Sequence, residues 1–298
     1  MDILLHVKGI ILAGGTGTRM WPITKGTSKQ LLPIYDKPLI YYPLSTLMSA
    51  EINEILIITT PGDRHQFEEL LGNGSDLGIK IAYATQPEPK GLAQAFTIGR
   101  DFIANDDVAL ILGDNLFYGA GLPALLKSSK TNLGACIFTT KVANPENYGV
   151  LNFDSAGKPE SVVEKPKHPK SNQAITGLYY FDNEVCTVAD KVTPSLRGEL
   201  EITSVIESYL EKETLNVVEL PKGMAWLDTG TPNSMHDASA FVRVIEERTG
   251  TKIGCLEEIS WINGWINNED IKRLALMLGK SEYGSYLSNI LNNQSSTL

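Results

Sequence analysis

Residues 9–19 read Gly9-Ile-Ile-Leu-Ala-Gly-Gly-Thr-Gly-Thr-Arg19, an apolar run that ends in closely spaced glycines and an arginine. The apolar run predicts a buried strand, and Gly14, Gly15 and Gly17 would let backbone N–H groups approach an anion closely. Arg19 follows directly, so its guanidinium can clamp the phosphates that these amides hold. The stretch predicts a strand followed by a phosphate-binding loop, the opening unit of an α/β fold.

Two familiar glycine loops do not fit this stretch. A dinucleotide-binding fingerprint needs G-x-G-x-x-G, and after Gly15 and Gly17 it is Met20 that stands where the last glycine belongs. A P-loop needs G-x-x-x-x-G-K-[ST], which the stretch lacks. An ordinary strand-to-helix turn would explain the glycines by themselves, but it gives no reason for Arg19.

Beyond this stretch, short segments rich in β-branched residues alternate with amphipathic segments. The alternation predicts βαβ units, and therefore an α/β fold with a mostly parallel central sheet and helices on both faces. Apolar spacing predicts helices at 36–50, 91–104 and 199–212. Strands are expected at 9–13, 54–59, 80–84, 108–112, 135–140, 149–153, 175–181 and 216–220.

The second half of the chain is organised differently. After about residue 144, shorter strands and proline-containing loops predict a small mixed β insertion on the sheet. Thr231-Pro232 is typical of a helix start, and another helix is expected from Asn267 or Asn268, so the chain should end in a helical appendage. We expect one catalytic core over residues 1–230, with a substrate-binding portion at about 144–230, and a helical segment over 231–298, for which the family resemblance given below implies oligomer or effector contacts.

Composition narrows the function classes. The 298 residues include 26 Lys and Arg against 35 Asp and Glu, a net charge of −9, which argues against a nucleic-acid or anionic-membrane partner. The three cysteines, Cys136, Cys186 and Cys255, lie far apart, so neither a disulfide framework nor a zinc site is favoured. The apolar runs are too short to span a bilayer and no signal peptide is visible, which predicts a cytoplasmic protein.

Two aspartates are candidate metal ligands. Asp114 follows the apolar run 108–112 in Gly113-Asp-Asn115, and Asp228 lies in Trp226-Leu-Asp-Thr-Gly230. The carboxyl ends of strands are where open α/β sheets bind ligands, and Mg²⁺ prefers one or two carboxylates together with phosphate oxygens. Either aspartate alone would more often be a turn or cap residue, but the two could converge on one metal.

Further polar residues are typical of a sugar-phosphate site. Lys165, in Glu164-Lys-Pro166, would present a point charge to a phosphate monoester, although a loop ion pair explains it equally well. Lys29 adds a cation near the glycine loop. Aromatic edges, glycines and carboxylates suited to sugar hydroxyls occur in Tyr148-Gly149, Gly177-Leu-Tyr179 and Arg197-Gly-Glu199.

Five motifs, in order, resemble the sugar-1-phosphate nucleotidylyltransferase family over nearly the whole chain. They are Leu12-Ala-Gly-Gly-Thr-Gly-Thr-Arg19, Ser28-Lys-Gln-Leu-Leu-Pro33, Gly113-Asp-Asn115, Glu164-Lys-Pro166 and Trp226-Leu-Asp-Thr-Gly230. The stretches 35–48 and 86–96 are similar to the thymidylyl-transferring branch of that family. The resemblance implies a Rossmann-like core, Mg²⁺ as cofactor, dTTP and glucose 1-phosphate as substrates, and a homotetramer that supplies dTDP-deoxysugar synthesis such as that of rhamnose.

The resemblance also implies a role for each matching residue. The catalytic group would be Arg19, Lys29, Asp114 and Lys165, and the metal ligands Asp114 and Asp228. The residues implied to bind the nucleotide are Leu12, Gly14, Gly15, Thr16, Gly17, Thr18, Arg19, Lys29, Gln30, Gln86, Gly91 and Asp114. Those implied to bind the sugar phosphate are Asn115, Tyr148, Gly149, Glu164, Lys165, Ile175, Tyr179, Arg197 and Glu199.

Three alternatives stay open at this point. Base choice depends on a few hydrogen bonds, so UTP could replace dTTP. A non-catalytic sensor of nucleotide sugars would share much of the site, and a nicotinamide dehydrogenase is disfavoured by the missing third glycine. Near the C-terminus, Ile262 occupies a position where an arginine is common in the family's effector segment, which leaves feedback regulation open.

Overall fold

The computed structural model describes residues 6–15, 17–130 and 134–294. Its strands are β1 (Val7–Ala13), β2 (Pro33–Ile34), β3 (Lys37–Pro38), β4 (Glu54–Thr59), β5 (Lys80–Thr85), β6 (Asp107–Leu112), β7 (Asn115–Tyr118), β8 (Ala135–Lys141), β9 (Gly149–Phe153), β10 (Pro159–Glu164), β11 (Gln173–Phe181), β12 (Leu215–Glu219) and β13 (Ala225–Asp228). Its helices are α1 (Tyr41–Ser49), α2 (Arg64–Leu71), α3 (Gln94–Ile98), α4 (Arg100–Ile103), α5 (Leu122–Ser128), α6 (Val185–Ala189), α7 (Ile202–Glu211), α8 (Pro232–Thr249), α9 (Leu256–Ile262), α10 (Asn268–Met277) and α11 (Glu282–Gln294).

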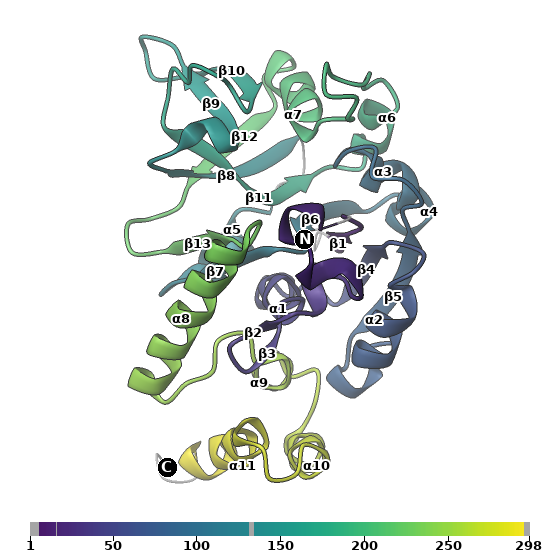
Figure 1. Ribbon diagram of the computed structural model, residues 1–298, viewed down its shortest axis with the longest axis vertical. Coiled ribbons are helices and arrows are strands. Elements are labelled where there is room, and N and C mark those ends of the chain that lie inside the picture. Colours follow the sequence, from purple (N-terminus) through teal and green to yellow (C-terminus); the bar gives the residue numbers. More distant parts are fainter. Residues whose placement is uncertain (1–5, 16, 131–133, 295–298) are drawn as a thin grey trace, which may run out of the picture.

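The parallel half of the main sheet positions the glycine loop (Figure 1). Strands β5, β4, β1 and β6 lie side by side in that order and run parallel. The chain moves outward from β1 through β4 and β5, then returns to the other side of β1 as β6. Ligands of open α/β sheets bind beside such a reversal, at the carboxyl ends of the strands. Here those ends are joined by a 2.9 Å hydrogen bond from the Gly113 N–H to the Leu12 carbonyl oxygen.

Both faces of this half are covered by helices, as the fold prediction requires. Ile11 on β1 and Ile57 on β4 belong to the core that contains residues of α1 and α5. Their neighbours Ile10 and Leu56 face the opposite core, with residues of α3, α6 and α7. A strand buried on both faces needs apolar side chains at every position, and burying each large one contributes about 1.5–3 kcal/mol. This is why residues 9–13 read as a continuous apolar run.

The other half of the sheet is mostly antiparallel, with β12 parallel to β8, and carries the predicted insertion. Strand β11 pairs antiparallel with β6 and with β8, and it also touches the β9–β10 hairpin. A separate two-stranded ribbon pairs β7 with β13. The ribbon was missed at the sequence level because its strands have only four residues each. The mixed, mostly parallel α/β prediction is confirmed.

All three helices predicted in the first 230 residues differ in their bounds from those in the structure. The helix expected at 36–50 begins only at Tyr41, because residues 33–38 form a hairpin in which Ile34 pairs with Lys37. The helix expected at 91–104 is two short helices that meet at Gly99. A Cβ on Gly99 would lie 2.8 Å from Ile10 Cδ1, so this glycine lets the segment pack closely on β1. The helix expected at 199–212 is α7, which begins at Ile202.

The C-terminal segment is helical, as expected. Thr231 caps α8 through a capping box with Ser234, and Asn267 caps α10 in the same way with Asp270. Helix α8 packs on the hairpin and on the β7–β13 ribbon, and α10 and α11 form a small core of their own (Figure 1). Within the described ranges, no helix is both long and apolar enough to cross a membrane.

Candidate active site

A cavity of about 600 Å³ opens at the carboxyl ends of β1 and β6, between the parallel half of the sheet and the insertion. It brings together most of the residues predicted for the site: Leu12, Gly15, Gly17, Thr18, Arg19, Lys29, Gln30, Gln86, Gly91, Asp114, Asn115, Tyr148, Gly149, Glu164, Lys165, Ile175, Tyr179, Arg197, Glu199 and Asp228. Gly14 lies against the lining residue Gln86 without being part of the lining, and Thr16 lies outside the described residues.

The glycine loop depends on the absence of side chains at two positions. Gly17 has a φ of 61°, in the left-handed region that disfavours a Cβ, and the loop turns there into a short helical turn over Thr18–Met20. The Thr24 hydroxyl donates a 2.7 Å hydrogen bond to the Gly17 carbonyl oxygen, which holds this turn. A Cβ on Gly14 would collide with Gln86 Oε1. Each of these glycines is therefore required by the backbone path or by a close approach.

Asp114 and Lys29 form a buried ion pair at one side of the cavity. Lys29 is only 8% exposed, although it comes from a loop far from Asp114 in the chain. The Asn115 amide donates to Asp114 Oδ1 at 2.9 Å. Burial by itself would raise the pKa of Asp114, but the Lys29 ammonium and these hydrogen bonds outweigh it and lower the pKa. Asp114 is therefore held as a carboxylate.

Asp228 is brought to the same place by the β7–β13 ribbon. In this ribbon Asp228 pairs with Asn115, and Thr229 donates to the Asp114 carbonyl oxygen from its N–H at 3.0 Å and from its hydroxyl at 2.9 Å. Burial raises the pKa of Asp228 to about 6, and the nearby charge of Asp114 adds to the increase. Arg19 lies beside this ribbon, since its guanidinium would contact a Cβ placed on Gly230 at 3.3 Å.

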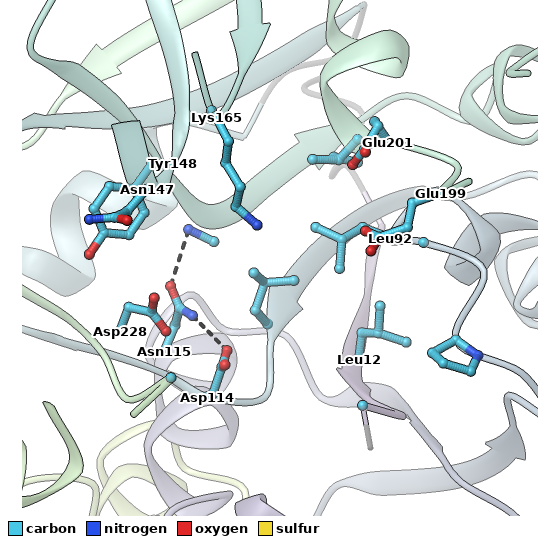
Figure 2. Close-up of a pocket in the computed structure, with 18 of the residues that line it drawn as sticks. Leu12, Leu92, Asp114, Asn115, Asn147, Tyr148, Lys165, Glu199, Glu201 and Asp228 are labelled. Atoms are coloured by element: carbon cyan, nitrogen blue, oxygen red, sulfur yellow. Dashed lines mark hydrogen bonds between the residues drawn. The ribbon is translucent and has the colours of Figure 1, made fainter. Parts of the chain in front are cut away.

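The paired aspartates have the donor chemistry of a hard cation. Figure 2 shows Asp114, Asn115 and Asp228 gathered at one side of the cavity. Two carboxylates are enough for Mg²⁺, which keeps several waters and takes further oxygens from substrate phosphates. A denser group of three or more His, Cys, Asp or Glu side chains that could hold a metal does not occur in the described part of the chain. The residues present therefore fit a metal that is completed by its ligand.

The opposite side of the cavity is a network centred on Arg197. Its guanidinium lies 3.3 Å from Glu164, 3.1 Å from Glu199 and 3.4 Å from Glu201. Burial raises the pKa of Glu164, against the opposing charge of Lys165, whose ammonium is 3.6 Å away. Lys165 has a φ of 42°, and its N–H donates to the Tyr148 carbonyl oxygen at 3.0 Å. Its side chain reaches into the cavity between the two sides (Figure 2).

Several lining residues were not predicted from the sequence. They are Met20, Pro89, Leu92, Leu112, Asn147, Glu201, Ile202 and Thr203. Glu201 is the most informative, because a carboxylate that is only 5% exposed needs a partner, and its spacing of four from Arg197 could have indicated one. Trp226, noted in the sequence only as the context of Asp228, donates from Nε1 to Asn115 Oδ1 at 2.5 Å.

Comparison with known proteins places this site in a family. The nucleotidyl transferase family model matches residues 8–244, which include both aspartates and all the predicted site residues. The chain belongs to the nucleotidyl transferase family. This nucleotidyl transferase is 52% identical to a glucose-1-phosphate thymidylyltransferase from Neisseria meningitidis over 96% of this chain and 99% of that protein. It is 54% identical to the glucose-1-phosphate thymidylyltransferase of Mycolicibacterium smegmatis, over 97% of this chain and the whole of that protein.

Solved structures agree with the family assignment. A candidate glucose-1-phosphate thymidylyltransferase from Bacillus anthracis, solved with sucrose, superimposes with a TM-score of 0.73 at 39% identity, over 80% of this chain and 95% of that one. A UDP-glucose pyrophosphorylase complexed with UDP-glucose reaches a TM-score of 0.70, over 81% of this chain and all of that one. At 24% identity, the second match supports the fold alone. The transferase assignment excludes the nicotinamide dehydrogenase alternative.

Proposed function

We propose that this nucleotidyl transferase transfers a thymidylyl group from dTTP to α-D-glucose 1-phosphate and releases pyrophosphate, giving dTDP-glucose. The observation that carries the proposal is the incomplete pairing of charges in the cavity, where Asp228 and Arg19 lie near the Asp114–Lys29 pair without ion-pair partners of their own among the described residues. Such a site suits a highly charged phosphate ligand together with a cation. The names of the two relatives that are more than half identical support the choice of both substrates.

The reaction needs positioning and charge neutralisation rather than a protein nucleophile. A phosphate oxygen of glucose 1-phosphate attacks the α-phosphorus of dTTP in line, and pyrophosphate leaves. Lys165, between the two sides of the cavity, aligns the attacking phosphate. Arg19, at the glycine loop, stabilises the charge on the leaving pyrophosphate, and Lys29 supports the nucleotide phosphates while it orients Asp114.

Asp114 and Asp228 would hold Mg²⁺, which when bound supplies positive charge to the phosphate oxygens. The two carboxylates differ in how easily they ionise. Lys29 keeps Asp114 ionised, whereas the pKa of Asp228 is about 6 when no cation is bound, so below that pH a cation has to displace a proton from Asp228. The protein therefore contributes one preformed carboxylate and one whose charge depends on pH and on the cation.

The remaining predicted residues divide between the two substrates. Leu12, Gln30, Gln86 and Gly91, on the parallel half of the sheet, would surround the nucleotide. The Arg197 network, with Tyr148, Tyr179 and Ile175, would surround the sugar. We further propose that the enzyme is a cytoplasmic homotetramer whose product supplies dTDP-deoxysugar synthesis, and that residues 231–298 make the oligomer or effector contacts.

Release of pyrophosphate tests the proposal directly. The purified protein is mixed with Mg²⁺ and glucose 1-phosphate, and dTTP is compared with UTP, with a control that lacks the sugar phosphate. Fast sugar-dependent release that favours dTTP is the expected result. Release with UTP alone would keep the mechanism and change the nucleotide. An absence of release with either nucleotide would contradict the proposal and favour a binding protein without catalysis.

A further inference from the structure

The Gln86 side chain is held by a residue that lies outside the cavity lining. Gln86 follows β5, is only 4% exposed, and forms part of the cavity wall. Its Nε2 donates to Gln94 Oε1 at 2.8 Å and to the Gly91 carbonyl oxygen at 3.3 Å. Gln94 is the first residue of α3, and its Oε1 also accepts a 3.3 Å hydrogen bond from the Lys90 N–H.

These contacts determine which way both amides point. The N and O atoms of a glutamine amide are normally assigned from their partners. The Lys90 backbone N–H can only donate, so the atom of Gln94 that faces it must be the oxygen. That oxygen can only accept, so the atom of Gln86 that faces it must be the NH₂ group. The carbonyl oxygen of Gln86 is therefore turned the other way, toward the Gly14 side of the cavity wall.

The Gln86 oxygen has no donor from the protein in the part of the chain that the structure describes. Its hydrogen bonds to Gly91 and Gln94 both use Nε2. Because Gln86 lines the cavity, a ligand that supplies an N–H can donate to this oxygen. Gly14 is needed at this point because a Cβ there would occupy the space beside the oxygen.

We propose that Gln94 is a positioning residue that keeps the Gln86 oxygen available to the nucleotide base and so selects bases that donate an N–H at this edge. The inference rests on the proposed function, since it assumes a nucleoside triphosphate in this half of the cavity. Thymine and uracil carry an N3–H donor, whereas N3 of cytosine is an acceptor. Gln94 therefore excludes cytidine nucleotides without touching the base, and it does not separate dTTP from UTP.

The test is the ratio of kcat/KM for dTTP to kcat/KM for dCTP, measured by pyrophosphate release with glucose 1-phosphate. A site built to hydrogen-bond a substrate N–H rejects an analogue without it strongly, and we expect a ratio above about 100 for the unaltered enzyme. Gln94→Met keeps the length and helix propensity but removes the nearer of the two acceptors of Gln86 Nε2 and leaves only the 3.3 Å contact with the Gly91 carbonyl oxygen. The Gln86 amide then turns more readily and can donate to cytosine. The ratio should then fall at least tenfold, mostly through a gain with dCTP.

A matched variant separates positioning from a structural role. Gln94→Glu keeps an oxygen that accepts from both Lys90 and Gln86, so the ratio should remain close to that of the unaltered enzyme. If Gln94 only stabilised the loop, Gln94→Met would lower kcat/KM for both nucleotides equally and leave the ratio unchanged. That result would overturn the inference.

A second measurement needs no variant and covers the case in which Gln94→Met does not fold. The unaltered enzyme should use N3-methyl-dTTP at least about 100-fold less efficiently than dTTP, because the methyl group replaces the donor. Equal use of the two would also overturn the inference. Failure of the proposed function looks different, since the unaltered enzyme would then release no pyrophosphate with dTTP or UTP.

Discussion

Two ionic clusters in this molecule each contain two cations and two carboxylates, but they differ in how completely these charges are paired within the protein. The first, here called the hairpin ring, joins Asp36 and Lys37 of the β2–β3 hairpin to Glu246 and Lys252 at the end of α8. Each lysine contacts both carboxylates, and Glu246 lies 2.9 Å from Lys37 and 2.7 Å from Lys252. The ring therefore has two positive and two negative groups, all satisfied within the protein. Burial opposes ionisation of Asp36, but the two lysines outweigh it and lower its pKa.

The second cluster is Asp114, Lys29, Asp228 and Arg19 at the cavity. Asp114 has Lys29, but Asp228 and Arg19 form no ion pair within the described ranges, and the pKa of Asp228 rises to about 6. Asp228 is partly buried and Arg19 is exposed, and a charged group whose pKa is shifted and that has no partner in the protein is typical of a functional site. The first cluster is complete within the protein alone. The second is not, which supports our proposal that the substrate and its cation complete it.

The largest effect expected is loss of activity in Asp228→Asn. Removal of a metal ligand should lower kcat by about 10³-fold, or about 4 kcal/mol in the transition state. Because Asn carries no charge at this buried position, the midpoint of thermal unfolding in metal-free buffer at pH 8 should not fall. Steady-state kinetics and a thermal melt test both statements. Unchanged activity with unchanged magnesium dependence would remove Asp228 from the metal site.

Arg19→Ala tests the other group that lacks a partner. Without charge stabilisation of the leaving pyrophosphate, kcat/KM should fall by an amount that corresponds to about 2–4 kcal/mol of transition-state stabilisation. The control is Arg243→Ala, since Arg243 is an exposed residue of α8 that pairs with Glu247 at 3.1 Å and should leave kcat/KM unchanged. The assignment of Arg19 fails if its variant keeps the kcat/KM of the unaltered enzyme for both substrates.

A substitution in the hairpin ring should lower the stability of the protein and leave its activity nearly unchanged. Glu246→Gln leaves Lys37, one of the most buried lysines, with Asp36 as its single carboxylate. The free energy of unfolding should decrease by about 3 kcal/mol, while kcat/KM of the folded enzyme changes by less than about twofold. Denaturant unfolding measures the first quantity. Glu247→Gln, which alters only an exposed pair, is the matched control and should cost well under 1 kcal/mol.

The smallest effect expected is a pH dependence that belongs to Asp228. Its pKa is raised from 3.8 to about 6 on folding, so its contribution to stability is complete below pH 3.8 and is lost as the pH rises through 6. In metal-free buffer, Asp228→Asn should therefore gain stability relative to the unaltered enzyme between pH 5 and pH 7.5, by about 2 kcal/mol at most.

The comparison between the two proteins is essential in that experiment, because burial also raises the pKa of Asp107 to about 6. Asp107 is present in both proteins, so its contribution cancels in the difference. With added Mg²⁺, Asp228→Asn should instead lose stability relative to the unaltered enzyme as the pH rises. The reason is that the cation binds the ionised carboxylate, which only the unaltered enzyme has. If the difference in free energy of unfolding between the two proteins did not change between pH 5 and pH 7.5, the raised pKa of Asp228 would be contradicted.

Much of the fold could be predicted because its signals are local. Strands at 54–59 and 149–153 were predicted with the bounds that the structure has, since each is a short run of apolar residues between turn residues. The capped starts of α8 and α10 were predicted from Thr231-Pro232 and Asn267 for the same reason. Errors arose where tertiary contacts override propensity, as at the β2–β3 hairpin, whose short strands pair before α1 begins.

The sequence by itself determined the fold class, the glycine loop and the identity of most residues that could line a site, because side-chain periodicity and glycine content act over a few neighbouring positions. Only the tertiary structure decided which of them meet. The β7–β13 ribbon brings Asp228 to Asp114, Glu201 joins the Arg197 network, and Gln94 orients the Gln86 amide. The tertiary structure also decided which charges pair in each ionic cluster, because Coulomb interactions and desolvation depend on distances between segments that are remote along the chain.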